Sequence, residues 1–272
     1  MLNKFSLKDQ NILITGASGL LGAQHAMAVA EAGGNLILVD IDLNSLKKLE
    51  EKLNKKFNIN VLTKKIDITN EIELVNFNAD LISKEIYLSG LINNAARNPK
   101  VEDGKINSSR LETFSSKEWD LDISVGLTGA FLCSKVFGNH MAKFSKKGVI
   151  LNISSDLGLI APDQRLYRKD GIDENKQSVK PVSYSVVKHG MIGLTKYLAT
   201  YWPGVIRSNA LCPGGVENNQ GKEFILRISD KIPMNRMAQK EEYQGTIIYM
   251  LSDASSYLNG AVIPVDGGRT AW

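Results

Sequence analysis

The stretch Asn11-Ile12-Leu13-Ile14-Thr15-Gly16-Ala17-Ser18-Gly19-Leu20-Leu21-Gly22 decides the fold. A short apolar run passes through three glycines into an amphipathic segment at 20–32, which predicts a buried strand, a tight turn and a helix. Each glycine has a use when a dinucleotide binds: the first permits the turn, the second lets the pyrophosphate approach the backbone, and the third lets the helix pack on the strand. Phosphates would then lie on the N–H groups of the first helical turn. A glycine-rich turn alone also fits an ordinary helix start.

The next predicted strand ends in Asp40, 18 residues after Gly22. A carboxylate at this place accepts hydrogen bonds from the adenosine ribose of a bound dinucleotide. No Arg or Lys occurs at 16–22 or directly after Asp40, so a 2′-phosphate would meet the carboxylate without a compensating charge. The pattern therefore predicts NAD in preference to NADP. The alternative is that Asp40 is a turn residue at the strand end or the N-cap of the following helix.

Strand and helix patterns alternate over the rest of the chain. Apolar runs typical of strands covered on both faces occupy 11–15, 35–40, 88–93, 148–153, 205–210 and 261–266, with a more polar strand at 59–66. Helical periodicity occupies 20–32, 43–56, 70–85, 116–144, 183–202 and 240–252. This alternation predicts an α/β fold with a doubly wound, mostly parallel sheet (a Rossmann fold) of about seven strands and helices on both faces. No linker interrupts the pattern, so we expect one domain over 1–272.

The composition excludes several classes of protein. The 272 residues are 43% hydrophobic and 23% charged, which is ordinary for a globular chain. A net charge of +4 without clustered Lys or Arg argues against a nucleic-acid partner. The two cysteines and three histidines have no metal-ligand spacing, so we expect no metal site and a reducing compartment. The first strand starts close to Met1 and no apolar run reaches about 18 residues, which predicts no signal peptide, no membrane partner and a cytoplasmic location.

A second group of residues suits proton transfer. Tyr184 and Lys188 are four residues apart, so on a helix their side chains share one face. A phenol has a pKa of about 10, and a nearby ammonium group favours the phenolate and brings that pKa toward the neutral range. Ser155 follows a buried strand, at the edge where open α/β sheets bind ligands, and could hold a substrate oxygen beside the phenol. The plain alternative is a Tyr and a Lys on a solvated helix.

With these motifs the chain resembles a short-chain dehydrogenase/reductase of the single-domain branch over nearly its whole length. Beyond the residues above, the shared motifs are Asp67-Ile68, Asn93-Asn94-Ala95-Ala96, Cys212-Pro213-Gly214-Gly215 and Asp266-Gly267-Gly268. The resemblance implies that Ser155 orients the substrate hydroxyl, that Tyr184 is the acid–base, and that Lys188 lowers the pKa of the tyrosine and holds the nicotinamide ribose. It also implies a set of cofactor-binding residues: Gly16, Ser18, Gly19, Leu20, Leu21, Gly22, Asp40, Asp67, Ile68, Asn93, Ala95, Tyr184, Lys188, Pro213, Gly214 and Val216.

Two local features depart from the family pattern. The glycines at 16, 19 and 22 are spaced GxxGxxG, which resembles the extended branch of the family that modifies nucleotide sugars. In the helix predicted at 116–144, the asparagine of the family's proton relay aligns with Gly126. Two interpretations follow: a water bound to another group completes the relay, or the relay is weakened.

The third departure is an insertion at 156–182, between Ser155 and Tyr184. Both of its ends lie at the expected mouth of the active site, so these 27 residues must cover or border the substrate pocket. We expect a lid that is partly mobile and that substrate orders. Arg165 and Arg168 are the candidate contacts to an anionic group, because a guanidinium suits phosphate geometry. Equally, 161–183 carries five basic and four acidic residues and fits a solvated loop.

The insertion resembles that of bacterial oxidoreductases of flagellin-glycan or legionaminic-type sugar pathways. The predicted function is therefore NAD-dependent interconversion of a secondary alcohol and a ketone on a small molecule, a sugar, sugar phosphate or nucleotide sugar. Two alternatives stay open: a sugar lyase or epimerase that keeps its NAD, favoured by the glycine spacing, and a cofactor-binding regulatory protein without turnover, favoured by Gly126. The family packs the helices at 116–144 and 183–202 across a two-fold axis, which implies a homodimer or homotetramer.

Overall fold

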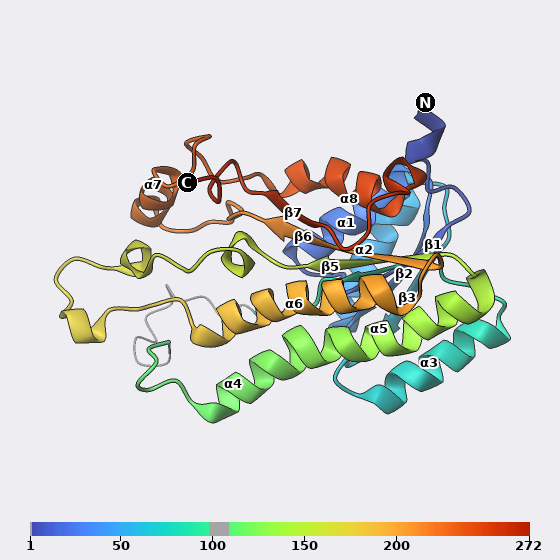
Figure 1. The fold of residues 1–272 in the computed structure, drawn as a ribbon, viewed down its shortest axis with the longest axis horizontal. Helices are drawn as coiled ribbons and strands as arrows, with labels where there is room; N and C mark the ends of the chain where they lie inside the picture. The colour runs from blue at the N-terminus through green and yellow to red at the C-terminus, as the bar shows by residue number, and fades with distance from the viewer. Residues whose placement is uncertain (1, 98–108) are drawn as a thin grey trace.

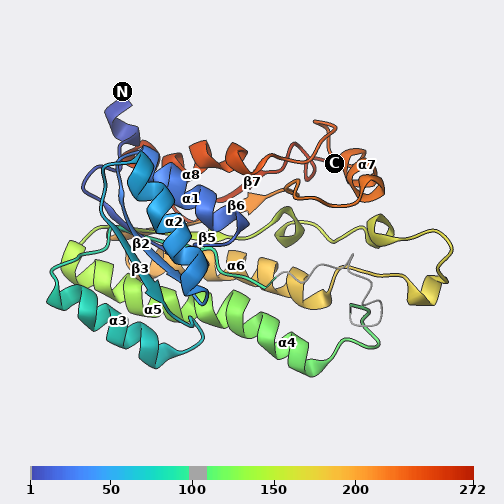
Figure 2. The same cartoon turned by 180° about the vertical axis from the view of Figure 1, so that it is seen from behind.

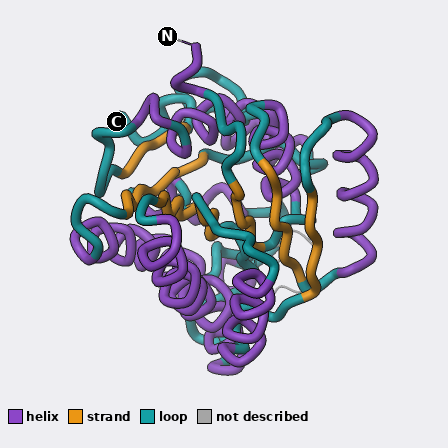
Figure 3. Tube along the Cα trace, turned by 90° about the vertical axis from the view of Figure 1, so that its right-hand side faces the viewer, coloured by secondary structure: helices purple, strands orange, loops and turns teal. Residues whose placement is uncertain are grey.

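A twisted sheet of seven parallel strands forms the centre of the structure, a computed structural model that describes residues 2–97 and 109–272 (Figures 1 and 3). The strand order is β3-β2-β1-β4-β5-β6-β7. This is a doubly wound order whose direction reverses between β1 and β4, as the alternation of the sequence predicts. The strands are β1 Asn11–Thr15, β2 Asn35–Asp40, β3 Val61–Lys65, β4 Gly90–Asn93, β5 Gly148–Ile153, β6 Ile206–Pro213 and β7 Val262–Val265.

Helices cover both faces of the sheet (Figure 2). One face carries α1 (Leu20–Glu31), α2 (Leu43–Lys56) and α8 (Gln244–Leu251), and the other carries α3 (Glu71–Ser83), α4 (Ser116–Ile123), α5 (Gly129–His140) and α6 (Val182–Tyr201). A π-helical turn at Ser124–Thr128 joins α4 to α5, and a second at Met141–Ser145 follows α5. Every residue of β5 is buried between the two layers, which explains why its sequence is apolar without alternation.

Side-chain caps begin several helices near the predicted positions. Asp42 accepts a hydrogen bond from the Ser45 backbone N–H at 3.1 Å and caps α2, Asn70 caps α3, and Ser115 caps α4. Helix α1 follows Gly19, which has no side chain with which to cap it. The N–H groups of its first turn therefore point toward the crevice at the end of β1, where they can hold an anion.

The region around the insertion contains structure that the sequence did not predict. Helix α7 (Lys222–Ser229) follows β6, and the insertion contains short 3-10 helices at Asp156–Gly158, Gln164–Tyr167 and Glu174–Lys176. Leu166 of the insertion packs with Ile228, Ile232 and Met237 in a small apolar cluster. The insertion and α7 therefore lie side by side beyond the carboxyl ends of the strands (Figures 1 and 2). Further 3-10 helices occur at Leu2–Phe5, Lys240–Tyr243 and Asp253–Ser255.

One helical stretch of the described residues, Ser116–Ser145, is long and apolar enough to cross a membrane, but 56% of its apolar window is buried within the fold, as in the core helix of a soluble protein. Both cysteines, Cys133 and Cys212, are buried and unpaired. Among residues 2–97 and 109–272, no group of three or more His, Cys, Asp and Glu side chains could hold a metal ion.

His25, in α1, makes folding sensitive to acid. Burial lowers the pKa of its imidazole from 6.5 to about 3, partly offset by the Asn94 side chain. The folded protein keeps His25 neutral while the unfolded chain protonates it below pH 6.5, so its contribution to stability is complete above that pH and is lost as the pH falls toward 3. We expect the free energy of unfolding, measured by urea titration, to fall by about 1.4 kcal/mol per pH unit in this window on account of His25.

In His25→Leu the dependence of unfolding free energy on pH should be shallower by that amount. The matched control is His189→Leu, because His189 is exposed and its removal should leave the dependence as it is. If the unfolding free energies of the wild type and His25→Leu depended on pH in the same way, His25 would not be the source of the acid sensitivity.

Candidate active site

The glycine turn lies in the crevice between β1 and β4. Gly16 has a φ of +59°, and a Cβ there would lie 2.7 Å from the Cα of Ala95, so glycine is required twice over. A Cβ on Gly22 would lie 2.2 Å from the Gly16 carbonyl oxygen, because α1 packs directly on the turn. The amide of Asn94 donates to the carbonyl oxygens of Thr15 and Gly16 at 3.0 and 2.9 Å. These bonds hold the turn open toward the crevice before any ligand binds.

Asp40 reaches the same turn from the end of β2. Its Oδ2 accepts hydrogen bonds from the Ser18 backbone N–H at 3.0 Å and from the Ser18 hydroxyl at 2.7 Å. Because Asp42 caps α2, the helix-cap alternative for Asp40 is wrong. Its alternative as a turn residue stays open, since Asp40 Oδ1 accepts from the Asp42 N–H at 3.2 Å. The half-buried carboxylate is positioned beside the glycine turn, as a ribose-binding group requires.

Polar groups at the ends of β4 and β5 complete the crevice. The buried amide of Asn93 donates to Ser134 Oγ at 3.0 Å and to Asn152 Oδ1 at 2.8 Å, while its own Oδ1 has no partner among the described residues. The Ala95 N–H donates to Thr15 Oγ1 at 3.1 Å. An unpartnered buried acceptor and a glycine cradle next to a carboxylate fit a nicotinamide dinucleotide.

The remaining residues assigned to the cofactor lie around this crevice in different environments. Asp67 is exposed and accepts from Thr69, whereas Ile68 is buried in the core against Gly129. Leu20 is exposed at the start of α1 and Leu21 is half-buried. Beyond β6, the Gly214 carbonyl accepts from the Tyr243 hydroxyl at 3.0 Å, and Val216 pairs with Ala238. Pro213 is the last residue of β6.

Ser155, Tyr184 and Lys188 come together at the carboxyl end of β5. The side chain of Ser155 lies close enough to the phenol of Tyr184 to lower its pKa. Lys188 is buried, its Nζ lies 5.7 Å from the centroid of the Tyr184 ring, and it donates to the Ile153 carbonyl oxygen at 2.9 Å. The structure therefore brings together the three residues that the sequence predicts to be catalytic.

The acidity of the phenol depends on its surroundings in the fold. Burial raises the pKa of Tyr184 to about 12, and the neighbouring Ser155 side chain offsets this only in part. Burial and the nearby charge of Lys180 lower the pKa of Lys188 to about 8. The lowering of the tyrosine pKa that the sequence predicts for Lys188 stays a prediction. In this structure burial has the larger effect on the phenol, and the ammonium donates to the Ile153 carbonyl oxygen.

A narrow pocket next to Tyr184 and Lys188 accounts for the missing relay asparagine. A Cβ on Gly126 would lie 2.6 Å from Val187 Cγ1, so a larger side chain does not fit there. One turn earlier, Asp122 is buried and accepts from the Ser183 hydroxyl at 2.5 Å and from Arg97 at 2.9 Å. Asp122 also lines the pocket, and is a polar group to which a relay water could bind.

A buried ion pair adjoins Ser155. Arg269 Nη1 lies 2.6 Å from Asp156 Oδ2, and the two side chains are 8% and 4% exposed. The Ser155 hydroxyl donates to the other carboxylate oxygen, Oδ1, at 2.7 Å. Neither residue was predicted from the sequence, although Asp156 directly follows Ser155 and Arg269 directly follows the Asp266-Gly267-Gly268 motif.

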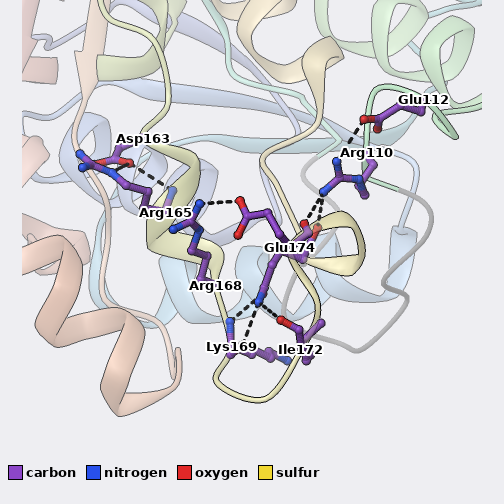
Figure 4. Close-up of polar contacts among 9 residues, drawn as sticks. Arg110, Glu112, Asp163, Arg165, Arg168, Lys169, Ile172 and Glu174 are labelled. Carbon is purple, nitrogen blue, oxygen red and sulfur yellow. Dashed lines mark hydrogen bonds and ion pairs between the residues drawn. The ribbon is translucent and has the colours of Figure 1, made fainter.

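The two arginines assigned to substrate lie in the insertion and form ion pairs there (Figure 4). Arg165 pairs with Asp163 through two nitrogens, at 2.8 and 2.7 Å, and Arg168 pairs with Glu174 at 2.5 Å. Arg110 donates to the Glu174 carbonyl oxygen at 3.0 Å and ties the insertion to the segment before α4. A cavity of about 260 Å³ is lined by residues of both the insertion and α7, beside the place where the two pack together. It is lined by Leu166, Tyr167, Arg168, Lys169, Ser178, Gly221, Glu223, Phe224 and Arg227.

Two family models match the chain: short chain dehydrogenase over residues 10–167 and Enoyl-(Acyl carrier protein) reductase over residues 172–270. The chain is also 30% identical over 280 residues to the NADP-dependent mannitol dehydrogenase of Hypocrea jecorina, a match that covers 99% of this chain and 96% of that protein. The chain belongs to the short-chain dehydrogenase/reductase family. It is therefore an oxidoreductase that acts on an alcohol or ketone with a nicotinamide cofactor.

Two further matches extend over the whole fold of this short-chain dehydrogenase. The 2-dehydro-3-deoxy-D-gluconate 5-dehydrogenase of Dickeya dadantii is 28% identical, over 100% of this chain and 99% of that protein. The crystal structure of a short chain dehydrogenase from Leptospira borgpetersenii with bound NAD+ has a TM-score of 0.82 and 28% identity, and the match covers 97% of this chain and 94% of that one.

Variants of Tyr184 and Lys188 distinguish an effect on turnover from an effect on cofactor affinity. Tyr184→Phe removes one hydroxyl, so we expect cofactor affinity, measured by calorimetry, to stay near wild type while turnover falls by a factor on the order of 10² or more. Lys188→Ala should lower turnover and also weaken cofactor binding. Near wild-type turnover of Tyr184→Phe would show that another group moves the proton.

Proposed function

We propose that this short-chain dehydrogenase uses NAD to interconvert a secondary alcohol and a ketone on a sugar, sugar phosphate or nucleotide sugar. The observation that carries the proposal is the convergence of Ser155, Tyr184 and Lys188 beside the crevice that suits a dinucleotide. The named relatives, a mannitol and a sugar-acid dehydrogenase, support a polyhydroxylated substrate. The narrower role in bacterial surface-glycan synthesis, including flagellin modification, rests on the resemblance of the insertion at 156–182.

The roles of the residues follow from their contacts. A nicotinamide cofactor held by the glycine turn, Asp40 and Lys188 would supply the chemistry of hydride transfer to and from the substrate carbon. Ser155 orients the substrate oxygen, and Tyr184 exchanges a proton with it. Because the pKa of Tyr184 is raised to about 12, the phenol is protonated at neutral pH and is ready to donate to a ketone oxygen. Oxidation of the alcohol needs the phenolate, so its rate should rise with pH.

A screen of substrates tests this function. Change in NADH absorbance is followed over sugar phosphates, nucleotide sugars and the matching unphosphorylated sugars, with Tyr184→Phe as the blank. Turnover of a sugar derivative by the wild type alone supports the proposal. NAD-dependent turnover confined to steroid, acyl or aromatic ketones would replace it. The lyase or epimerase stays as an alternative. Membership of the family and the intact Ser155–Tyr184–Lys188 arrangement argue against the regulatory protein without turnover.

The preference for NAD is proposed on the geometry of Asp40. Its carboxylate is held at the glycine turn by Ser18, where a 2′-phosphate would meet a negative charge. The relative from Hypocrea jecorina is named as NADP-dependent, so the proposal separates this chain from it.

Calorimetry with NADH and NADPH tests the proposal directly. We expect NADH to bind at least about tenfold tighter to the wild type, or about 1.4 kcal/mol. Asp40→Ala should reduce this ratio because it removes the charge that repels the 2′-phosphate. Equal affinities in the wild type would reject the assignment.

We further propose that the insertion forms the substrate side of the site and that an anionic group of the substrate occupies the cavity between it and α7. The lining contains three positively charged side chains, Arg168, Lys169 and Arg227, and one negatively charged side chain, Glu223. The rings of Tyr167 and Phe224 lie 5.6 Å apart and offer flat apolar surface for a sugar or base. The exposed pair between Arg168 and Glu174 is weak enough for a phosphate to replace the carboxylate.

Arg168 and Arg165 form a matched pair of variants for this proposal. Arg168 lines the cavity, whereas Arg165 is bound by Asp163 and belongs to the same loop. On an active phosphorylated substrate, Arg168→Ala should raise KM about tenfold or more, the loss of one charge-assisted contact. Arg165→Ala should change KM less, and neither should alter cofactor affinity. Replacement of 161–178 by a short Gly/Ser link should raise KM at least as much. Unchanged kinetics in that variant would refute a role of the insertion.

The assembly, the single domain and the cytoplasmic location remain proposals. Large apolar side chains on the outer faces of α4, α5 and α6 support association into a homodimer or homotetramer, because their exposure on a lone chain is unfavourable. They are Leu121, Phe131, Val186, Tyr197 and Tyr201, which are between 40% and 61% exposed.

A further inference from the structure

The hydroxyl of Ser155 has two acceptors near it. It donates to Asp156 Oδ1 at 2.7 Å. The phenol of Tyr184 is the other, close enough for the Ser155 side chain to lower its pKa. The Leu157 N–H approaches the Ser155 oxygen at 3.2 Å and so supplies a donor to it. A serine hydroxyl has a single proton, so the proton that goes to Asp156 is withheld from Tyr184.

Asp156 is an acceptor of fixed charge and position. Its second oxygen, Oδ2, is paired at 2.6 Å with Arg269, and both side chains are almost fully buried. A buried carboxylate of this kind is retained only with a compensating charge. The pair joins the first residue of the insertion to the chain after β7, 113 residues further on.

The backbone after β7 is built to direct Arg269 inward. Gly267 and Gly268 both have positive φ, at +67° and +89°, and turn the chain back past Pro233. Asp266 fastens this turn, because its carboxylate accepts hydrogen bonds from the N–H groups of Gly268 and Thr270, both at 2.9 Å. The turn therefore places the Arg269 guanidinium against Asp156, which in turn accepts the hydrogen bond from Ser155.

We propose that Asp156 and Arg269 are positioning residues for the reaction: the pair decides whether the single proton of the Ser155 hydroxyl points to Asp156 or to the oxygen of Tyr184. With Tyr184 protonated, the Ser155 proton lies on Asp156, and the lone pairs of Ser155 face the site. With Tyr184 ionised, the Ser155 proton turns to the phenolate. The charge of Asp156 opposes that turn, and the charge of Arg269 assists it by weakening Asp156 as an acceptor.

The charges around the phenol agree with this arrangement. Asp156 raises the pKa of Tyr184, whereas the Ser155 side chain and Arg269 lower it. Other charged groups face the same ring or line the adjoining pocket and are left in place by the test. They are Lys180, whose Nζ lies 3.8 Å from the ring centroid, Lys188, Arg97 and Asp122.

The test is a titration of Tyr184 by NMR of protein labelled with ¹³Cζ-tyrosine, which needs no substrate. Tyr184→Phe identifies the resonance among the eight tyrosines, and the fully exposed Tyr257 is the internal control. With a pKa of about 12, about a tenth of Tyr184 is ionised at pH 11. Asp156→Asn should raise that fraction to about a half, which corresponds to a fall of about one unit in the pKa of Tyr184. Arg269→Gln should lower it below the wild-type value.

Shifts of opposite sign show that both charges act on Tyr184, and they support the proposal only if Ser155→Ala, added to Asp156→Asn, abolishes the gain in ionised fraction. An unchanged or smaller ionised fraction in Asp156→Asn overturns it. Each single variant leaves a buried charge unpaired and could unfold the chain, so Asp156→Asn/Arg269→Gln, which leaves none, provides the second comparison.

In this double variant a neutral amide replaces the carboxylate as the acceptor from Ser155. Because an amide is a weaker acceptor than a carboxylate, the Ser155 proton should turn to the phenolate, and the ionised fraction at pH 11 should exceed that of the wild type. Addition of Ser155→Ala should remove the excess. A double variant that titrates as the wild type does, or an excess that survives Ser155→Ala, shows that Ser155 does not connect the pair to Tyr184.

Discussion

The structure depends on the close approach of β1 and β4, where the winding of the sheet reverses. Gly16 and Ala95 touch there so closely that a Cβ on Gly16 would lie 2.7 Å from the Ala95 Cα. The amide of Asn94 bridges the two strand ends by bonds to the carbonyl oxygens of Thr15 and Gly16. Because both strand ends stop at this contact, their loops separate beyond it and leave the crevice into which α1 points its N-terminus.

The sheet and its helices could be predicted from the sequence because their signals are local. Strands covered on both faces must be apolar throughout, and the helices on each face repeat every three to four residues. Helix α7 gave no comparable signal, since it has eight residues and shares its apolar side with Leu166, far away in the sequence. The same limit applies to the insertion, whose ion pairs depend on partners such as Arg110 from before α4.

Those residues of the candidate site that belong to short sequence motifs could be predicted from the sequence. Ser155, Tyr184 and Asp40 follow strands or begin helices at recognisable places, and the structure brings the first two together. Asp156 and Arg269 could not be paired in this way, because contact between them requires the whole sheet and the turn after β7. The acidity of Tyr184 also depends on burial, which spacing along a helix does not report. A four-residue interval places Lys188 on the correct face, but not at the phenol oxygen.

The arrangement at the end of β5 also explains how a long insertion coexists with an ordered catalytic group. Asp156, the first residue of the insertion, is bound to Ser155 on one side and to Arg269 on the other, so the chain leaves the sheet already fixed. At the other end, Ser183 is held by Asp122 directly before Tyr184. The two buried carboxylates therefore fix both ends of the loop next to Ser155 and Tyr184, independently of the exposed ion pairs in its middle.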